Sequence, residues 1–302
     1  MPNTIAHFAI NGLFTRAIIT HSDFKWIYLA CVIPDLPWIL QRIIKTLPLM
    51  IDLYDLRAYC IAQSSLLLCV FLCAALAMLA KQRSKVFIIL VIGCLLHLLL
   101  DAVQTKWANG VLLFAPFDWN LLRFDFFWPE SLGTYLITAA GLLYFIFNIR
   151  KTIQLNCQEF KLTLMTLSIS VVFLLIWLTS PLAYMQSVFS ADNHYISTLK
   201  DFNNRTGKEI EIDRNIIIHE DGEIKLKTSY GELITLENIE TRNGARISLQ
   251  GKFLDKNKIY VNSFRTHSNF RNYASMVGLA CVLLVWLIFI SRCCLIRRRE
   301  KN

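Results

Sequence analysis

The sequence predicts a polytopic all-α membrane bundle of about six spans, with a small all-β extracytoplasmic domain inserted before the last span. Of the 302 residues, 55% are hydrophobic, and the mean hydropathy is +0.46, which is more apolar than most soluble domains. Several apolar runs reach the roughly 20 residues that a helix needs to cross a hydrocarbon core. The segment 182–273, in contrast, is polar and alternating.

Six apolar runs are the candidate spans. A fifth and a sixth run are weaker than the other four, because the fifth is less apolar and the sixth contains Pro34, Asp35 and Pro37. The first stretch, 5–20, is too polar to span easily, so we expect a short or re-entrant helix that packs against the others. The four clear runs are 64–80, 86–103, 162–181 and 274–290, the fifth is 132–149, and the sixth is 24–44.

The net charge of +9 lies mainly in three short basic segments, at 81–85, 150–161 and 292–301. If all three segments are cytoplasmic, a single membrane topology satisfies the positive-inside rule. The C-terminus is then cytoplasmic and residues 182–273 are extracytoplasmic, as expected of a multi-pass protein of the cell membrane, here a bacterial inner membrane. The basic charge is explained by orientation, so we expect membrane lipids and no nucleic acid as partners. The oligomeric state stays open.

The chain divides into three parts. Residues 1–181 form the predicted helical membrane domain, 182–273 the β domain, and 274–302 a C-terminal anchor with a basic tail. Five to six short strands are expected in the β domain, beginning with a hairpin around Asp221-Gly222, and a small OB-like barrel is one candidate for its fold. His194, His219 and His267 lie far apart in this domain, and we expect them to be surface histidines without a function.

The strongest chemical signal is His97 followed by Asp101 inside an apolar helix. The i,i+4 spacing places both side chains on one helical face. An ionisable side chain at membrane depth costs about 2.5–3.5 kcal/mol on insertion scales, so it normally has a partner. Imidazole and carboxylate are common metal ligands. The alternative is that the two residues bond to each other and only stabilise the bundle.

Two further polar positions extend this pair. Asp35 follows Pro34 in the middle of an apolar run, and His7 lies between apolar residues near the start. Together, His7, Asp35, His97 and Asp101 supply two imidazoles and two carboxylates. Such a set could hold one or two divalent ions, with zinc as the leading candidate and with water at an open position.

Several elements follow one another along the chain in a definite order: His7, Pro34-Asp35, Arg57, His97 with Asp101, Thr105, Gly110 and Pro116-Phe117. This ordered set resembles the YdjM-like family, described as LexA-binding, inner-membrane-associated hydrolases, over roughly the first 130 residues. Where the family pattern has Thr-His-Ser, this chain has Ala62-Gln63-Ser64. Either the site holds fewer ions than the family implies, or Gln63 ligates weakly through its amide oxygen, or catalysis has been lost.

The family is in turn similar to zinc-dependent phospholipases C, which are all-helical enzymes. This resemblance implies metal-dependent hydrolysis of a phosphoester, with a lipid as one candidate substrate. Asp35 or Asp101 would act in catalysis as general base, and Arg57 and Arg123 are candidates for substrate binding.

Two other classes of function compete with hydrolysis. One is a non-catalytic membrane scaffold whose β domain binds an extracytoplasmic partner, which the glutamine at position 63 favours. The other is a transporter or channel whose intramembrane acids carry protons or ions. The absence of internal sequence symmetry, which is common in transporters, argues against the transporter.

Overall fold

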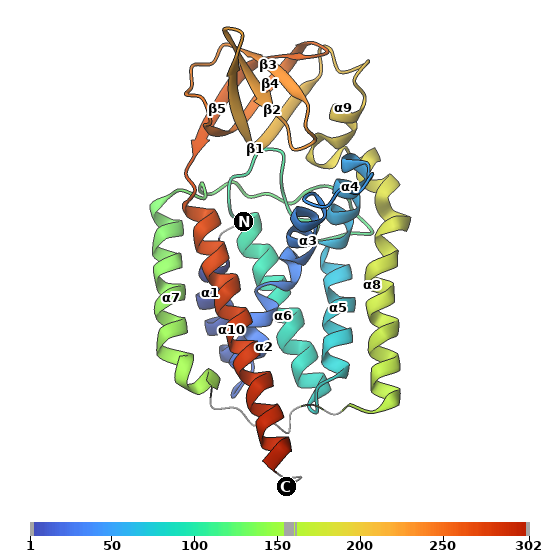
Figure 1. Ribbon diagram of the computed structural model, residues 1–302, viewed down its shortest axis with the longest axis vertical. Helices are drawn as coiled ribbons and strands as arrows, with labels where there is room; N and C mark the ends of the chain where they lie inside the picture. Colours follow the sequence, from blue (N-terminus) through green and yellow to red (C-terminus); the bar gives the residue numbers. More distant parts are fainter. Residues whose placement is uncertain (1–2, 154–159, 161, 300–302) are drawn as a thin grey trace.

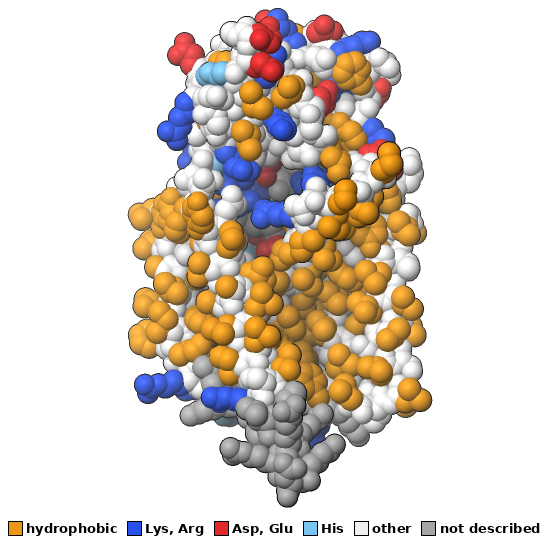
Figure 2. Space-filling view, viewed as in Figure 1, with side chains coloured by type: hydrophobic (Ala, Val, Ile, Leu, Met, Phe, Trp, Pro, Cys, Tyr) orange, Lys and Arg blue, Asp and Glu red, His pale blue; other side chains and the backbone are white. Residues whose placement is uncertain are grey.

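A bundle of long apolar helices carries a small β-barrel on one end, and the C-terminus lies at the other end (Figure 1). This computed structural model describes residues 3–153, 160 and 162–299. On the face shown in Figure 2, a broad hydrophobic belt covers the bundle, whereas charged side chains gather on the barrel and at the opposite end. This distribution is compatible with a multi-pass membrane protein.

The helices follow one another up and down the bundle, with short helices before α4 and after α8. Their bounds are α1 Thr4–Ile18, α2 Phe24–Ala30, η1 Ile33–Asp35, α3 Leu36–Ile44, α4 Leu53–Gln63, α5 Leu66–Met78, α6 Arg83–Ala102, α7 Leu132–Ile153, α8 Leu164–Ser190, η3 Asn193–Tyr195, α9 Ile196–Lys200 and α10 Phe270–Arg299.

Five helical segments are long and apolar enough to cross a membrane, and a sixth is added if α4 and α5 form one broken span. The predicted number of spans is therefore confirmed as a count of candidate helices. These segments are Phe24–Ile44, Arg83–Ala102, Leu132–Thr152, Leu164–Ser190 and Phe270–Cys293.

Two helix limits differ from the sequence prediction. The run 64–80, predicted as one clear span, yields only the 13-residue helix α5, because Ser65 is extended and α4 meets α5 at 70°. Helix α8 continues through Pro181 to Ser190, past the boundary expected at residue 181. Pro181 is accommodated inside this helix, where it removes one backbone donor.

Helix α1 lies between α7 and α10 and is held very close to both. The Asn3 amide donates to Thr138 Oγ1 of α7 at 2.7 Å. A Cβ atom at Gly141 of α7 would overlap with the carbonyl oxygen of Ile5, and one at Gly278 of α10 would lie 2.7 Å from the Thr4 Cβ. These two glycines therefore set the position of the first turn of α1, which precedes His7.

The apolar run 24–44 is broken in the middle. Helix α2 ends at Ala30, a single 3₁₀ turn runs from Ile33 to Asp35, and α3 begins at Leu36. Pro34 starts this turn, where its missing N–H costs no helical hydrogen bond. The break exposes the carbonyl of Cys31 and the Asp35 carboxylate to the interior of the bundle.

The five strands form a closed barrel in the order β1-β2-β3-β5-β4, in which only the β3–β5 pair is parallel. The predicted hairpin is confirmed, since Glu220 pairs with Glu223 around Asp221 and Gly222, both with positive φ. Alternate residues such as Ile217, Leu226 and Ile247 fill the barrel core. The strands are β1 Glu209–Glu220, β2 Glu223–Lys227, β3 Leu233–Glu237, β4 Arg246–Asp255 and β5 Lys258–His267.

Polar contacts fix the barrel on the bundle. The loop after α6 meets β1, because Glu211 accepts from the Ala108 backbone N–H at 2.6 Å and pairs with Arg123 at 2.9 Å. From the bundle side, Lys45 Nζ donates to the carbonyl of Ser229 at 3.0 Å. The surface between bundle and barrel is hollowed, and Lys and Arg side chains line the rim of this hollow (Figure 2).

Candidate metal centre

The four polar residues predicted to form a site lie together at the barrel end of the bundle. His7 is on the first turns of α1, Asp35 ends η1, and His97 and Asp101 are on the last turns of α6. Both histidines are fully buried, whereas the side-chain exposure is 6% for Asp101 and 16% for Asp35. Three segments of the chain thus bring their polar side chains to one buried point.

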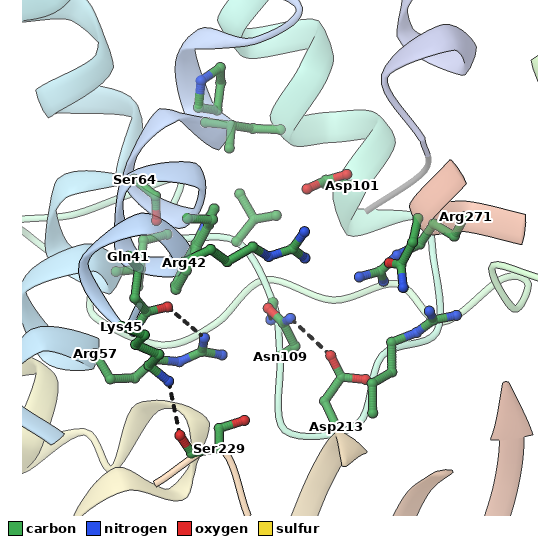
Figure 3. A pocket seen from close by; sticks show the side chains of 18 of the residues that line it. Gln41, Arg42, Lys45, Arg57, Ser64, Asp101, Asn109, Asp213, Ser229 and Arg271 are labelled. Atoms are coloured by element: carbon green, nitrogen blue, oxygen red, sulfur yellow. Dashed lines mark hydrogen bonds between the residues drawn. The ribbon is translucent and has the colours of Figure 1, made fainter. Parts of the chain in front are cut away.

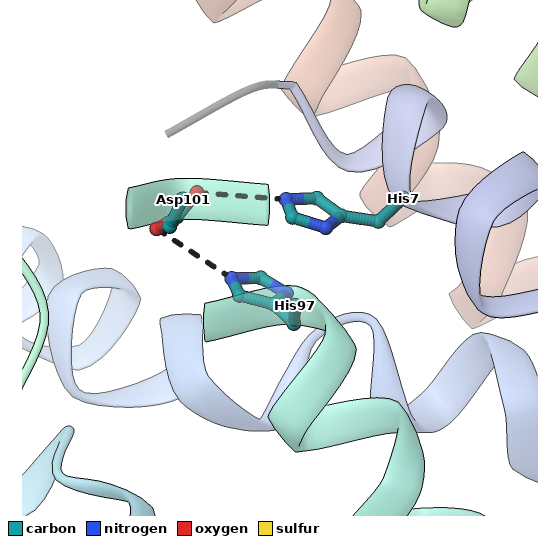
Figure 4. Close-up of side chains that lie close together, drawn as sticks. All are labelled: His7, His97 and Asp101. Atoms are coloured by element: carbon teal, nitrogen blue, oxygen red, sulfur yellow. Dashed lines mark ion pairs between the residues drawn. The ribbon is translucent and has the colours of Figure 1, made fainter. Parts of the chain in front are cut away.

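The distances within this cluster are longer than hydrogen bonds. His7 Nε2 lies 3.7 Å from Asp101 Oδ1, while His97 Nε2 lies 3.6 Å from Asp35 Oδ1 and 3.9 Å from Asp101 Oδ2. The two imidazole rings stack with centroids 3.8 Å apart and planes inclined by 4°. Both rings therefore present a nitrogen to the same carboxylate (Figure 4).

One hydrogen bond orients His97. Its Nδ1 lies 2.9 Å from the carbonyl oxygen of Cys31, and since a carbonyl only accepts, Nδ1 carries the proton. In a neutral ring, Nε2 is then a bare acceptor that faces the carboxylates of Asp35 and Asp101. Such a meeting of acceptors is unfavourable unless a positive charge lies between them, either a proton or a metal ion.

Several buried atoms of the cluster have no hydrogen-bond partner among the described residues. They are both ring nitrogens of His7, Nε2 of His97, Oδ1 of Asp35 and Oδ1 of Asp101. Folded proteins leave few buried polar atoms unpaired, because each costs about 1–3 kcal/mol. This accumulation at one point therefore makes the cluster a candidate binding site for a positively charged group.

The donor set fits a divalent ion. One ligand atom each from His7, His97 and Asp101 all lie within 4.8 Å of one another. Ligand bonds of about 2.0–2.2 Å in a tetrahedral zinc site separate neighbouring ligand atoms by about 3.3–3.6 Å. Small side-chain movements would close the difference. Asp35 lies 3.6 Å from His97 Nε2 but is not one of these three ligands.

Lys106 is a member of the cluster that the sequence analysis missed. Its Nζ lies 3.5 Å from Asp101 Oδ1 and donates to the Asp101 carbonyl at 3.2 Å, and its side chain is only 4% exposed. A basic residue just after a helix C-terminus is a common pattern, and this was the available signal. The ammonium group neutralises part of the Asp101 charge, so it would compete with an ion for that oxygen.

Asp101 also faces a cavity of about 380 Å³ between the bundle and the barrel, which we call the junction cavity. Six cationic side chains and two acidic ones line it, several of them shown in Figure 3. The cationic residues are Arg42, Lys45, Arg57, Arg214, Arg246 and Arg271, and the acidic ones are Asp101 and Asp213.

The two arginines predicted to bind substrate have different surroundings. Arg57 lines the junction cavity, where it donates to Gln41 Oε1 at 3.3 Å and stacks over Trp38. Arg123 is already paired, with Glu211 at 2.9 Å and Asp125 at 2.8 Å. Of these two arginines, only Arg57 has no carboxylate partner among the described residues, so only Arg57 can pair with an added anion.

Gln63, predicted as a weak metal ligand, is directed toward α8. Its amide nitrogen donates to Tyr59 Oη at 3.2 Å and to the carbonyl of Trp177 at 3.4 Å. These bonds leave the amide nitrogen with two partners outside the cluster of His7 and His97. Gln63 therefore contacts helix α8 and does not join the cluster of His7, Asp35, His97 and Asp101.

Two histidines of the β domain are not surface residues, so that part of the sequence prediction is wrong. His194 is buried, and its Nδ1 lies 3.0 Å from the Arg57 guanidinium. Burial and then the Arg57 charge lower the pKa of His194 well below its ordinary value. His267 is buried as well, whereas His219 is exposed as predicted. Docking of the barrel buries these rings, and strand alternation gives no sign of it.

His267 belongs to a second polar cluster. Its Nε2 lies 2.8 Å from Ser248 Oγ, and its Nδ1 lies 3.0 Å from Glu130 Oε2. Glu130 also pairs with Arg214. Burial alone would raise the pKa of Glu130, but the hydrogen bond from His267 and the charge of Arg214 lower this pKa. This cluster joins the end of the loop before α7 to strands β4 and β5.

Comparison with known proteins adds no relative to these observations. No family model, no curated protein and no solved structure matches the chain.

Proposed function

We propose that this protein is a membrane-embedded, metal-dependent hydrolase of phosphoesters, in keeping with its resemblance to the YdjM-like family. The observation that carries the proposal is the convergence of unpaired ligand atoms from His7, Asp35, His97 and Asp101 beside a cation-lined cavity. A metal ion and an anionic substrate are the complementary partners of these two features.

The proposal includes a placement in the bacterial inner membrane, with the barrel extracytoplasmic and the C-terminus cytoplasmic. The hydrophobic belt and the candidate spans support a multi-pass membrane protein. The basic residues at 81–85 and 150–151, at the end of the bundle opposite the barrel, support the orientation. The strand order β1-β2-β3-β5-β4 with a single parallel pair supports an OB-like barrel. In this orientation the site opens at the extracytoplasmic side.

His7, His97 and Asp101 would hold the ion, with zinc as the leading candidate because imidazole and carboxylate suit it. When bound, the ion lowers the pKa of water and neutralises charge on phosphoryl oxygens. The carbonyl of Cys31 orients His97 toward this position, as partners of metal-binding histidines commonly do.

Asp35 is the carboxylate best placed to act as general base. It is more exposed than Asp101, and it has no lysine comparable to Lys106 within ion-pair distance among the described residues. It would take a proton from the attacking water. The water oxygen then bonds to phosphorus, the bond to the alcohol oxygen breaks, and this oxygen takes up the proton. Arg57 would bind phosphoryl oxygens.

Elemental analysis of the purified protein tests the metal site directly. Near-stoichiometric zinc or manganese is expected in the wild-type protein and its loss in the His97→Ala/Asp101→Ala variant. The matched control is His267→Ala, which removes a buried histidine of the second polar cluster and should leave the metal unchanged. Hydrolysis of a chromogenic phosphate ester should follow the metal content. Equal metal in the double variant and the control would contradict the proposal.

A non-catalytic scaffold is the second candidate, and the position of Lys106 favours it. Its ammonium already lies beside Asp101, and a proton on His97 could supply the remaining positive charge. The cluster would then only hold α1, η1 and α6 together, while the barrel binds an extracytoplasmic partner. Absence of metal from the wild-type protein, with a destabilised double variant, would favour this function.

A further inference from the structure

The junction cavity holds positive charge that the protein itself does not balance. Among the described residues, five of its six cationic side chains form no ion pair with a carboxylate, and only Arg214 does, with Glu130. The polar partners that they do have are neutral. Arg57 contacts Gln41 and His194, Lys45 donates to a carbonyl, and Arg246 donates to the carbonyl of Arg214.

The ionisable groups outside the membrane segments reflect this excess of charge. Burial and then the nearby Arg57 lower the pKa of Lys45. Burial and then Arg271 lower the pKa of Arg214 to about 10. Despite its burial, the charges of Arg271 and Arg214 lower the pKa of Asp213. Crowded cations of this kind are stabilised by an anion that neutralises several of them together.

A second, smaller cavity extends the first toward the surface of the bundle. This lateral cavity of about 100 Å³ lies between the first turn of α1, α3 and α10. It shares Trp38, Arg42, Arg271 and Asn272 with the junction cavity. Its other lining residues are Thr4, Asp35, Ile39, Ser275, Met276 and Leu279. The two cavities thus meet at Arg42 and Arg271 and approach the cluster from two sides, at Asp101 and at Asp35.

The outer end of the lateral cavity lies within the hydrophobic belt. Met276 on α10 is 67% exposed, and Ile43 on α3 is 53% exposed. The hollow between barrel and bundle opens directly above this belt (Figure 2). A ligand at the rim therefore has cations on one side and an apolar surface on the other.

We propose that the junction cavity binds the headgroup of a lipid that ends in a phosphate or diphosphate, and that the lipid chains leave between α3 and α10. The inference adds a substrate class to the proposed function and rests on it for the reaction, although not for binding. The cavity volume lies within the range of small-ligand sites. A headgroup beside Arg42 and Arg271 would place its phosphorus next to the two carboxylates of the cluster.

The same lining disfavours zwitterionic phospholipids. A choline or ethanolamine headgroup brings an ammonium group, which needs a carboxylate or an open aromatic face. Trp38 is the single aromatic residue among the described residues that line the junction cavity, and the Arg57 guanidinium covers it at 4.6 Å. The two acids are outnumbered by six cations. Headgroups with two or more negative charges should therefore bind best.

Binding to the detergent-purified protein, measured by displacement of a fluorescent phosphatidic acid, tests the headgroup. Long-chain phosphatidic acid and an isoprenoid diphosphate should bind at least roughly tenfold more tightly than phosphatidylcholine. Glycerol 3-phosphate, which has the same headgroup without chains, should bind at least roughly tenfold more weakly than phosphatidic acid. Equal binding of phosphatidylcholine would overturn the headgroup assignment. Equal binding of glycerol 3-phosphate and phosphatidic acid would overturn the assignment of a lipid and would indicate a soluble phosphate ester as the ligand.

Two pairs of variants test the location. Arg42→Gln/Arg271→Gln should weaken phosphatidic acid binding by roughly tenfold or more, whereas Arg242→Gln, on an exposed barrel position outside both cavities, should not. Met276→Trp should weaken binding of phosphatidic acid but not of glycerol 3-phosphate. Val277→Trp, which is 50% exposed and lines neither cavity, is its control. Unchanged binding in Arg42→Gln/Arg271→Gln, or equal effects of the two tryptophans, would overturn the proposed route.

The same assay separates this inference from the metal proposal. The His97→Ala/Asp101→Ala variant keeps all six cationic residues, so it should still bind phosphatidic acid whether or not the wild-type protein holds metal. Lipid binding without any metal would support the inference and contradict the proposed hydrolase. A wild-type protein that holds metal but does not prefer phosphate-terminated lipids would contradict this inference and would leave the proposed hydrolase uncontradicted.

Discussion

Two buried clusters of histidine and carboxylate lie at the barrel end of this protein, and they differ in how their polar atoms are paired. In the cluster of Ser248, His267 and Glu130, neighbouring atoms lie 2.8–3.0 Å apart. In the cluster of His97 and Asp101, the corresponding separations are 3.6–3.9 Å. The first cluster is closed by its own hydrogen bonds, and the second leaves room for another positive group.

The comparison shows that residue types alone do not identify a site. Ser248, His267 and Glu130 have the order of a nucleophilic triad, but Ser248 is fully buried and its Oγ also accepts from the Arg214 backbone and contacts Asp213. No substrate could reach this hydroxyl. The His97 cluster has fewer bonds and unpaired atoms, and it adjoins two cavities. Unmet bonding capacity beside a cavity is the better sign of function.

The largest expected difference between the clusters is in metal affinity. Asp101→Asn removes a charged ligand atom, so it should lower metal affinity by more than the roughly 10–100-fold caused by loss of an outer-shell partner. Glu130→Gln makes the same chemical change in the other cluster and should leave metal affinity unchanged. Competition with a chromogenic chelator measures both, and equal losses would remove the distinction between the clusters.

The second expected difference between the clusters is in the free energy of unfolding. Here the cluster of His267 should be the more sensitive one. Glu130→Ala leaves the buried Arg214 without its carboxylate, which should destabilise the docked barrel by about 3–5 kcal/mol. Thermal unfolding and proteolysis of the junction would report this loss, with metal content preserved. A stable Glu130→Ala protein that loses its metal would show that the closed cluster has the functional role instead.

A third test disturbs the open cluster without changing any of its residues. Gly141→Ala forces α7 away from the first turn of α1, at a cost of about 1–3 kcal/mol. Because His7 follows on the same helix, metal affinity should fall as well. Gly133→Ala is the matched control on α7, since a Cβ atom there would contact only the Ser131 side chain. If both variants keep full metal affinity, then the position of α1 does not control the site.

The smallest expected effect is a pH dependence at His194. Burial lowers its pKa, so below about pH 6.5 the unfolded chain binds this proton more readily than the folded protein does. Stability should therefore fall as the pH falls, by at most about 1.4 kcal/mol per pH unit from this residue. His194→Gln should flatten the dependence of the melting temperature between pH 7 and pH 5.5, whereas the exposed-site variant His219→Gln should not.

Local patterns in the sequence predicted much of this structure. The apolar runs gave the candidate helices, Asp221-Gly222 gave the first hairpin, and the i,i+4 spacing placed His97 and Asp101 on one face. Asp35 could be added because a carboxylate after a proline in an apolar run needs a partner. These features depend on neighbouring residues, whose geometry is fixed by the local backbone.

The remaining parts depend on how distant segments dock. Arg246 and Arg271 join Arg42 in the junction cavity only because the barrel and the start of α10 face α3 across it, and no local pattern contains this information. Burial of His267 has the same origin. The bend between α4 and α5 was missed because serine at the start of an apolar run is compatible with a helix, so the composition of 64–80 does not reveal the extended Ser65.

The close packing of α1 between α7 and α10 has a consequence for biosynthesis. His7 precedes Gly141 and Gly278 in the chain, so translation makes α1 before the two helices whose glycines define where α1 lies. During translation the nascent chain therefore contains all four polar residues long before their supporting surface exists. The cluster of His7, Asp35, His97 and Asp101 would take its final geometry only after α10 has packed against α1, so a chain cut before Gly278 should hold α1 less firmly.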